Sequence, residues 1–266
     1  MFKRKIYVEL KNWKEESNGS TAIMIEGARR VGKSTIVEEF AHNEYEDYIL
    51  IDFSDADKAI LDNFENIGDM DTFFRNLFIL TGKRLTKRKG VVVFDEVQFF
   101  PRARQAIKQL VKDGRFDYIE TGSLISIKKN VKDILLPSEE ENLKMYPMDF
   151  EEFLWAIGND VYMDAIREAF DKRKPLGNDI HRKIMQTFRV YMAVGGMPKA
   201  VSTYVDGKDY KEIDRQKRAI LRLYINDLKK HDSEEGDKAD AVFKSLPEQL
   251  MNHNSVFRLS VIDEKA

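Results

Sequence analysis

The sequence predicts an α/β fold in which a parallel β-sheet presents polar side chains at the carboxyl ends of its strands. The first observation is the apolar run 22–25, which is followed by a glycine-bounded turn and a helix-forming stretch. The second is the run 90–96, in which β-branched residues lead to two adjacent carboxylates. The third is the strand-like stretch 117–120, which leads into polar residues. Short apolar runs with polar tips are typical of parallel strands that are buried on both faces.

Residues 27–35 read GARRVGKST and match the pattern G-x-x-x-x-G-K-[ST] of a phosphate-binding loop, the Walker A motif. Gly27 and Gly32 lack a Cβ, so the backbone can wrap around a phosphate with its N–H groups pointing inward. Lys33 can reach the β- and γ-phosphates, the Ser34 hydroxyl can bind Mg²⁺, and the helix that Thr35 starts adds positive charge at its N-terminus. The predicted nucleotide contacts in the loop are Gly27, Ala28, Arg29, Arg30, Val31, Gly32, Lys33, Ser34 and Thr35. The chain is therefore predicted to bind a nucleoside triphosphate.

A further strand is predicted at 48–53, and residues 69–85 suit a helix with one apolar face. A strand is thus inserted between the phosphate-binding loop and the carboxylates that follow residue 94. This insertion is what the additional-strand, catalytic-glutamate branch of phosphate-loop ATPases shows, in contrast to the kinase and GTPase branch.

Residues 90–96 read GVVVFDE and look like a Walker B strand. A central parallel strand would deliver Asp95 to the sheet edge where Ser34 lies, so these two residues are the predicted metal ligands. Glu96 is placed to orient the attacking water or to accept its proton, which favours hydrolysis over kinase chemistry. The alternative is a surface Asp-Glu pair that closes a strand.

The next segments predict a helix at 102–111 and a strand at 117–120 that leads into residues 121–123. A hydroxyl at this point, from Thr121 or Ser123, could hydrogen-bond the γ-phosphate or the attacking water and act as a sensor. A plain turn with a capping serine is the alternative. Lys33, Glu96 and Thr121 are the predicted catalytic residues.

Five segments in this order, GARRVGKST, VVVFDEVQ, ETGSLIS, YPMDFEEFL and VGGMPKAV, resemble a family of AAA-type ATPases of bacteria and archaea. The resemblance implies Mg²⁺-dependent binding and hydrolysis of ATP. Members of that family commonly carry a nuclease-like C-terminal domain of unknown function. The present chain stops at Ala266, and we expect either a truncation at the C-terminus or a naturally short gene product. If it is truncated, the nuclease-like module is absent and no nuclease activity is assigned to the chain.

Gly196-Met197-Pro198 is similar to the G-x-P motif in the helical lid of signalling ATPases of the apoptotic and plant-resistance kind. In those proteins the proline packs on the adenine, so the resemblance makes Pro198 a predicted nucleotide contact. Proline breaks a helix and glycine allows close backbone approach, which permits this role. A helix-ending turn is the alternative.

Three domains are predicted: a nucleotide-binding α/β core at 1–146, a helical lid at 147–230 and a remnant at 231–266. The lid begins with a capping-box pattern at 149–152 and contains a long charged helix pattern at 210–230. Within the remnant, residues 242–250 resemble the first part of a winged-helix-like unit that looks incomplete.

Composition limits the cellular setting and the partners. The 266 residues include no cysteine, which removes disulfides and thiol catalysis and agrees with a cytoplasmic location. No apolar segment suits a targeting core or a membrane helix. The net charge of −2 gives no global attraction to nucleic acid, although residues 83–89 concentrate five basic groups that could touch phosphates or simply form a solvated helix end.

The leading prediction is a Mg²⁺-dependent ATPase whose lid moves with the nucleotide state. The first alternative is a nucleotide-controlled signalling switch with slow hydrolysis, and the second is a DNA-associated motor or loader. The predicted partners are ATP or ADP, with a homo-oligomer or a protein partner suggested by the family. The arginines of the loop could face a γ-phosphate, a neighbouring subunit or solvent, and no spacing rule selects an arginine finger among Arg102, Arg104 and Arg115.

Overall fold

The structure is a computed structural model that describes residues 1–123, 138–231 and 235–251. The chain divides into two compact units, Met1–Val205 and Asp206–Ala266, and each is described by itself. The three predicted domains, 1–146, 147–230 and 231–266, divide the chain differently and stay a prediction.

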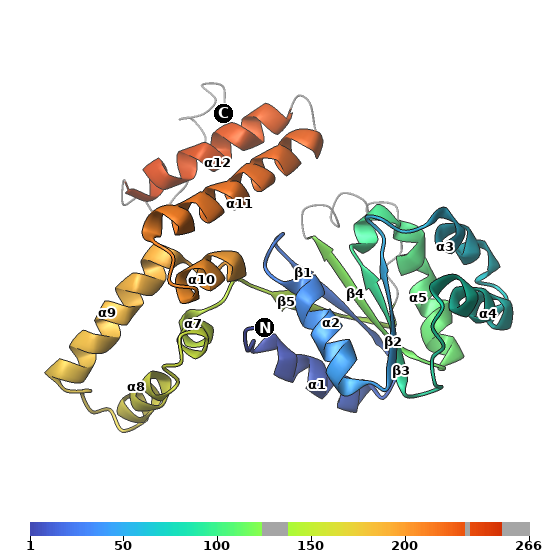
Figure 1. The fold of residues 1–266 in the computed structure, drawn as a ribbon, viewed down its shortest axis with the longest axis horizontal. Helices are drawn as coiled ribbons and strands as arrows, with labels where there is room; N and C mark the ends of the chain where they lie inside the picture. Colours follow the sequence, from blue (N-terminus) through green and yellow to red (C-terminus); the bar gives the residue numbers. More distant parts are fainter. Residues whose placement is uncertain (124–137, 232–234, 252–266) are drawn as a thin grey trace. The chain divides into compact units, whose positions relative to one another are not determined.

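A five-stranded parallel sheet forms the centre of the first unit (Figure 1). Its strands are β1 (Ala22–Gly27), β2 (Asp47–Asp52), β3 (Gly90–Asp95), β4 (Asp117–Ser123) and β5 (Glu140–Met145). They lie in the order β2-β3-β4-β1-β5, and every neighbouring pair is parallel. The predicted α/β fold class is therefore confirmed, and the carboxyl ends of all the strands meet at one edge of the sheet.

Strand β2 lies between the phosphate-binding loop and β3 in the sequence, as predicted, but it forms an outer edge of the sheet. The strand that separates β1 from β3 in space is β4. Thr121 of β4 pairs with Ile25 of β1, and Ile119 pairs with Val93 of β3. Thr121 consequently lies between the loop that follows β1 and the carboxylates that follow β3.

Helices cover both faces of the sheet (Figure 1). On one face pack α1 (Ile6–Ser17) and α2 (Lys33–Glu44), and on the other α3 (Lys58–Asn63), α4 (Met70–Thr81) and α5 (Pro101–Asp113). Successive side chains of a strand point to opposite faces, so Ile23 and Ile25 enter the core under α1 and α2, whereas Ala22 and Met24 enter the other core. Two short 3₁₀ helices, Phe64–Asn66 and Val97–Phe99, complete this region.

The ends of the helices follow local chemistry. Helix α4 is shorter than the predicted 69–85 because Gly82, with a φ of 65°, ends it in the left-handed conformation. At its start, Asp69 accepts a hydrogen bond from the backbone N–H of Thr72 at 3.2 Å. Helix α5 includes the predicted 102–111 and begins at Pro101, whose fixed φ suits a first turn.

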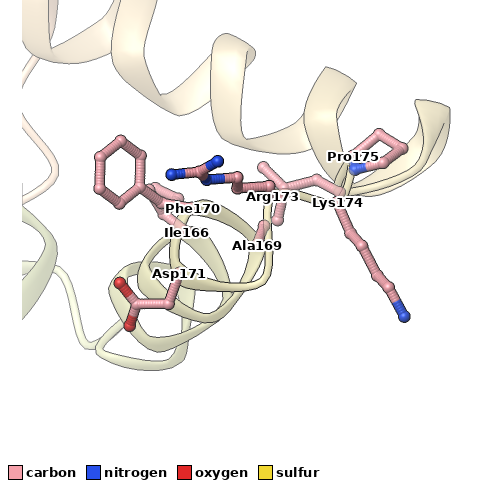
Figure 2. A pocket seen from close by; sticks show the side chains of 8 residues that line it. Ile166, Ala169, Phe170, Asp171, Arg173, Lys174 and Pro175 are labelled. Atoms are coloured by element: carbon pink, nitrogen blue, oxygen red, sulfur yellow. The ribbon is translucent and has the colours of Figure 1, made fainter.

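The described part of the first unit contains four further helices, here called the lid helices: α7 (Phe150–Ala156), α8 (Val161–Asp171), α9 (Asn178–Val194) and α10 (Pro198–Val205). The capping box predicted at 149–152 is present. The Asp149 carboxylate accepts from the Glu152 N–H at 2.9 Å, and the Glu152 carboxylate accepts from the Asp149 N–H at 3.2 Å. A pocket lies where α8 ends (Figure 2); Ile166, Ala169, Phe170, Asp171, Arg173, Lys174, Pro175 and Leu176 line it, and none of these is a predicted site residue.

The second unit contains the long helix α11 (Tyr210–His231) and helix α12 (Glu235–Met251), which pack against each other. Residues 242–250, which resemble the start of a winged-helix-like unit, lie inside α12, and residues 252–266 lie outside the described part. In the ranges that the structure describes, no helix combines the length and the apolar character needed to cross a bilayer.

A charged cluster is buried in the sheet core on the α5 side. Arg104 binds Glu140 through two hydrogen bonds of 2.9 and 2.6 Å. Glu120 of β4 is fully buried, and neither of its carboxylate oxygens has a donor among the described residues. Burial raises the pKa of Glu120 well above its ordinary value; the negative charge of Glu140 raises this pKa further, whereas the positive charge of Arg104 lowers it.

Replacing Glu120 by Gln is expected to make the stability of the chain less dependent on pH. Because the folded chain binds this proton more tightly than the unfolded chain, the associated stability is present below the ordinary glutamate pKa of 4.5 and is lost as pH rises through the raised pKa. Glu120→Gln keeps the shape and removes the titration, so the variant should gain stability at the upper end of this range. Thermal unfolding at a series of pH values measures the effect, with the exposed Glu9→Gln as control. Identical pH profiles for Glu120→Gln and the parent chain would contradict it.

Candidate functional site

The phosphate-binding loop connects β1 to α2 at the carboxyl edge of the sheet. Gly27 ends β1 beside β5, and a Cβ on it would lie 2.4 Å from the carbonyl oxygen of Met145. Gly32 has a φ of 102°, which residues with a side chain rarely adopt. Both glycines are therefore required by the protein backbone itself, the first by its contact with β5 and the second by its positive φ.

The ammonium group of Lys33 lies inside this loop. Its Nζ donates to the carbonyl oxygens of Gly27 at 3.1 Å and of Ala28 at 3.2 Å. Burial lowers the pKa of Lys33, although the negative charges of Glu96 and Asp95 raise it. A buried ammonium whose partners are neutral carbonyl groups is well suited to bind an anion, because a negative charge compensates the desolvation of the ammonium better than two carbonyl groups do.

The other residues of the loop differ in exposure. Val31 is buried in the core under α1 and α2. Arg29 is half-buried and lowers the pKa of Lys33 by its charge, whereas Arg30 is exposed with a φ of 65°. Thr35 is exposed in the first turn of α2; this helix begins at Lys33, two residues before the predicted start.

Two hydroxyl groups converge on one carboxylate at the centre of the site. Ser34 Oγ donates to Asp95 Oδ1 at 3.0 Å, and Thr121 Oγ1 donates to the same oxygen. Asp95 and Thr121 are buried. Because Mg²⁺ prefers hydroxyl, carboxylate and water oxygens, the adjacent oxygens of Ser34 and Asp95 fit the predicted metal.

Glu96 follows Asp95 in the left-handed conformation, with a φ of 54° and a ψ of 48°. This conformation costs a residue with a side chain about 1 to 2 kcal/mol, so surrounding contacts must hold it. One such contact is the hydrogen bond from the Glu96 N–H to Thr121 Oγ1, at 3.1 Å. Lys33, Ser34, Asp95, Glu96 and Thr121 are thus brought together by the ends of three strands.

Gln98 is a polar residue of the site that sequence reasoning missed. Its Nε2 donates to Glu96 Oε2, and its Oε1 accepts from the backbone N–H of Ser123 at 3.4 Å. Ser123, one of the two predicted sensor candidates, thus contacts Glu96 only through Gln98 in these hydrogen bonds. The available signal was the polar residue two positions after Glu96, inside an otherwise apolar stretch.

The lid helices contact the phosphate-binding loop at Pro198. This residue begins α10, and its Cγ lies 3.7 Å from the position that a Cβ on Gly32 would take. Gly196, just before it, accepts a hydrogen bond from the Met148 N–H at 2.7 Å, and a Cβ on Gly196 would lie 2.1 Å from the Met148 carbonyl oxygen. The predicted adenine contact of Pro198 stays a prediction, but the residue does lie beside the loop.

A second connection between loop and lid was not predicted: it is made by Arg4, which is buried. Its guanidinium donates to the Val31 carbonyl at 3.0 Å, to the Tyr146 carbonyl at 2.6 Å and to Glu152 of α7 at 3.1 Å. One side chain thereby joins the loop, the end of β5 and the first lid helix. No sequence pattern indicates this role, since a single arginine near the start of a chain is common on solvated surfaces.

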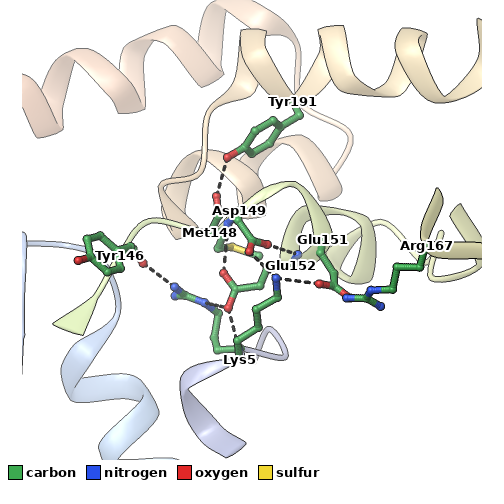
Figure 3. Close-up of polar contacts among 9 residues, drawn as sticks. Lys5, Tyr146, Met148, Asp149, Glu151, Glu152, Arg167 and Tyr191 are labelled. Carbon is green, nitrogen blue, oxygen red and sulfur yellow. Dashed lines mark hydrogen bonds and ion pairs between the residues drawn. The ribbon is translucent and has the colours of Figure 1, made fainter. Parts of the chain in front are cut away.

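The neighbouring Lys5 strengthens the same connection (Figure 3). The Lys5 ammonium lies 2.5 Å from the Asp149 carboxylate and 2.7 Å from the Glu151 carboxylate. The backbone N–H of Lys5 donates to the Glu152 carboxylate at 2.7 Å. Figure 3 also shows the Tyr191 hydroxyl, which donates to the Met148 carbonyl at 2.9 Å. The start of α7 is thus held from both sides, by residues before α1 and by α9.

The arginines considered as fingers have partners within the chain. Arg104 is buried against Glu140, and Arg115 contacts Asp113 and Asp71. Arg102 is exposed and lies 3.8 Å from Glu65. The buried pair makes Arg104 a structural residue, and the finger stays unassigned.

Comparison with known families identifies the core. A family model described as an AAA domain matches residues 19–154, which is more than half of the 266-residue chain. The chain belongs to this AAA family. The matched AAA domain contains the phosphate-binding loop, Asp95, Glu96 and Thr121, and ATP binding and hydrolysis are properties of the family. A second model, a domain of unknown function (DUF8612), matches residues 185–266 and contains Pro198.

Solved structures support the fold of the AAA domain. The chain is similar to the Walker-type ATPase PABY2304 of Pyrococcus abyssi, with a TM-score of 0.54 and 15% identity over 99% of this chain and 88% of that one. AMPPCP-bound DnaA from Aquifex aeolicus is 12% identical over 85% of this chain and 67% of that one, with a TM-score of 0.45. A likeness at this last level adds nothing to the assignment. A search of curated proteins found no match to the chain.

Proposed function

We propose that the chain is a Mg²⁺-dependent ATPase that couples its nucleotide state to the position of its lid helices. The observation that carries the proposal is the convergence of Ser34, Asp95 and Thr121 beside the ammonium of Lys33, with Glu96 next along the chain. This arrangement brings a phosphate-binding lysine, a pair of metal ligands and a candidate base to one edge of the sheet. A bound Mg²⁺ would neutralise phosphate charge and polarise the terminal phosphate.

The proposed roles follow from the position of each group. The loop N–H groups and Lys33 bind the phosphates, since Lys33 can exchange the carbonyls of Gly27 and Ala28 for phosphate oxygens. Ser34 and Asp95 hold the metal. Glu96 orients the attacking water and accepts its proton, and Thr121 keeps Asp95 and the Glu96 backbone in place while it senses the γ-phosphate.

The coupling to the lid rests on two contacts of the loop. Pro198 adjoins Gly32, and we propose that it packs on adenine as the resemblance implies. Arg4 connects the Val31 carbonyl to Glu152 of α7. A nucleotide that shifts the loop backbone would alter both contacts, so its binding energy can bias the lid position.

The same two contacts favour the second candidate, a nucleotide-controlled switch. In a switch, the difference in nucleotide affinity between two lid positions determines the response, and the rate of hydrolysis matters less. The two functions differ in turnover, which a phosphate-release assay measures directly.

Lys33→Ala is expected to weaken ATP binding roughly 10- to 100-fold, because a charge-assisted hydrogen bond contributes about 1.5 to 3 kcal/mol. Phosphate release and equilibrium binding of a fluorescent ATP analogue, both with Mg²⁺, measure the effect. Lys108→Ala, an exposed position on α5, is the matched control. Turnover by the parent chain that Lys33→Ala abolishes supports the ATPase, whereas tight binding without turnover favours the switch. Unchanged binding in Lys33→Ala would contradict both.

A further inference from the structure

Gln98 is a buried amide beside the proposed base, and the predicted site did not include it. It lies in the 3₁₀ helix Val97–Phe99, directly after the left-handed turn at Glu96. Its side chain bridges Glu96 Oε2 and the backbone N–H of Ser123 at the end of β4. One residue therefore ties the carboxylate after β3 to the strand that carries Thr121.

The two partners determine how this amide is oriented. The Ser123 N–H can only donate, so it selects the oxygen of the Gln98 amide. The ionised Glu96 carboxylate can only accept, so it selects the NH₂ group. Glutamine satisfies both partners, whereas glutamate would satisfy Ser123 and repel Glu96. Methionine, of similar size, would satisfy neither.

The bond to Gln98 uses one oxygen of the Glu96 carboxylate. Within the described parts of the chain, no hydrogen bond or ion pair engages the other oxygen, Oε1. A carboxylate held by one oxygen is limited in its rotation, and its second oxygen keeps a fixed direction. A general base held by a third group in this way has the same logic as a base in a catalytic triad.

We propose that Gln98 is a positioning residue. It is held by the Ser123 N–H at the end of β4, and from there it orients the Glu96 carboxylate toward the attacking water. The inference rests on the proposed ATPase function. In this proposal Gln98 acts through Glu96 and not directly on the phosphate or the water. Its loss therefore lowers kcat and leaves the binding of ATP, and hence KM, nearly unchanged.

The test compares steady-state phosphate release in Gln98→Glu and Gln98→Met with the parent chain. Both variants are expected to lower kcat roughly 10- to 100-fold, the effect typical of a residue that orients a reactive group. Gln98→Glu is the decisive variant, because it keeps an oxygen that can accept from the Ser123 N–H, while it loses the donor to Glu96 and places a repelling charge beside it. Gln109→Glu, an exposed position on α5, is the matched control. Equilibrium binding of a fluorescent ATP analogue is measured for every variant.

A second comparison separates positioning from a structural role. In a Glu96→Gln background, the change Gln98→Met is expected to cause no further loss of turnover, because the group that it orients has gone. A full further loss there, or a parent-like kcat in Gln98→Glu, would overturn the inference while the parent ATPase stands. A parent chain that binds ATP without releasing phosphate would overturn the proposed function and this inference with it.

Discussion

Glu96→Gln is expected to lower phosphate release from ATP by roughly 10²- to 10⁴-fold, the usual contribution of a general base. The glutamine has the shape of the glutamate and keeps an oxygen that can accept from Gln98, but it cannot accept a proton from water. Lys33, Ser34 and Asp95 are untouched, so MgATP binding should persist. Phosphate release and equilibrium nucleotide binding, measured on the same preparation, check the two halves of this expectation.

Glu38→Gln, an exposed position on α2, controls for the loss of one negative charge near the loop. If Glu96→Gln turned over ATP at the parent rate, Glu96 would not be the base. If it lost nucleotide binding as well, the residue would act in binding rather than in the chemical step.

Arg4→Ala is expected to cost about 3 to 5 kcal/mol of unfolding free energy. The substitution leaves the Glu152 carboxylate, whose side chain is 6% exposed, as a buried charge without its ion-pair partner. It also removes the donor to the Val31 and Tyr146 carbonyl oxygens. Urea unfolding followed by circular dichroism measures the loss.

Two comparisons identify the source of that loss. Lys5→Ala should cost no more than about 1 kcal/mol, because the Lys5 side chain is 43% exposed and the buried Glu151 carboxylate keeps its ion pair with Arg167. The pair Arg4→Met and Glu152→Gln should be less destabilising together than the sum of the two single changes. Strictly additive effects would mean that the ion pair does not carry the stability.

The local part of the site could be predicted from the sequence. The loop 27–35 and the pair at 95–96 are contiguous motifs, whose spacing follows from phosphate size and strand direction. The capping box at 149–152 is equally local, because both of its hydrogen bonds join residues three positions apart. Such patterns act over a single turn and do not depend on the rest of the fold.

The remaining contacts depend on tertiary structure. Arg4 bonds to Glu152 across 148 positions of the chain, and no periodicity indicates such a pair. Strand β5, at Glu140–Met145, reads as a polar segment because it contains Glu140, Glu141 and Lys144, and it was not predicted. The burial of Glu140 depends on its ion pair with Arg104, which sequence spacing does not show. The sheet order was equally hidden: the sequence places β2 between the two motifs, whereas the fold places β4 there.

The interposed β4 acts as a spacer of fixed width. Neighbouring strands lie about 4.8 Å apart, so two steps across the sheet separate β1 from β3 by about 10 Å. A direct pairing of β1 with β3 would halve that span. In the proposed ATPase, the width of one extra strand separates the loop that binds the phosphates from Glu96, and the attacking water and the terminal phosphate would meet in that space.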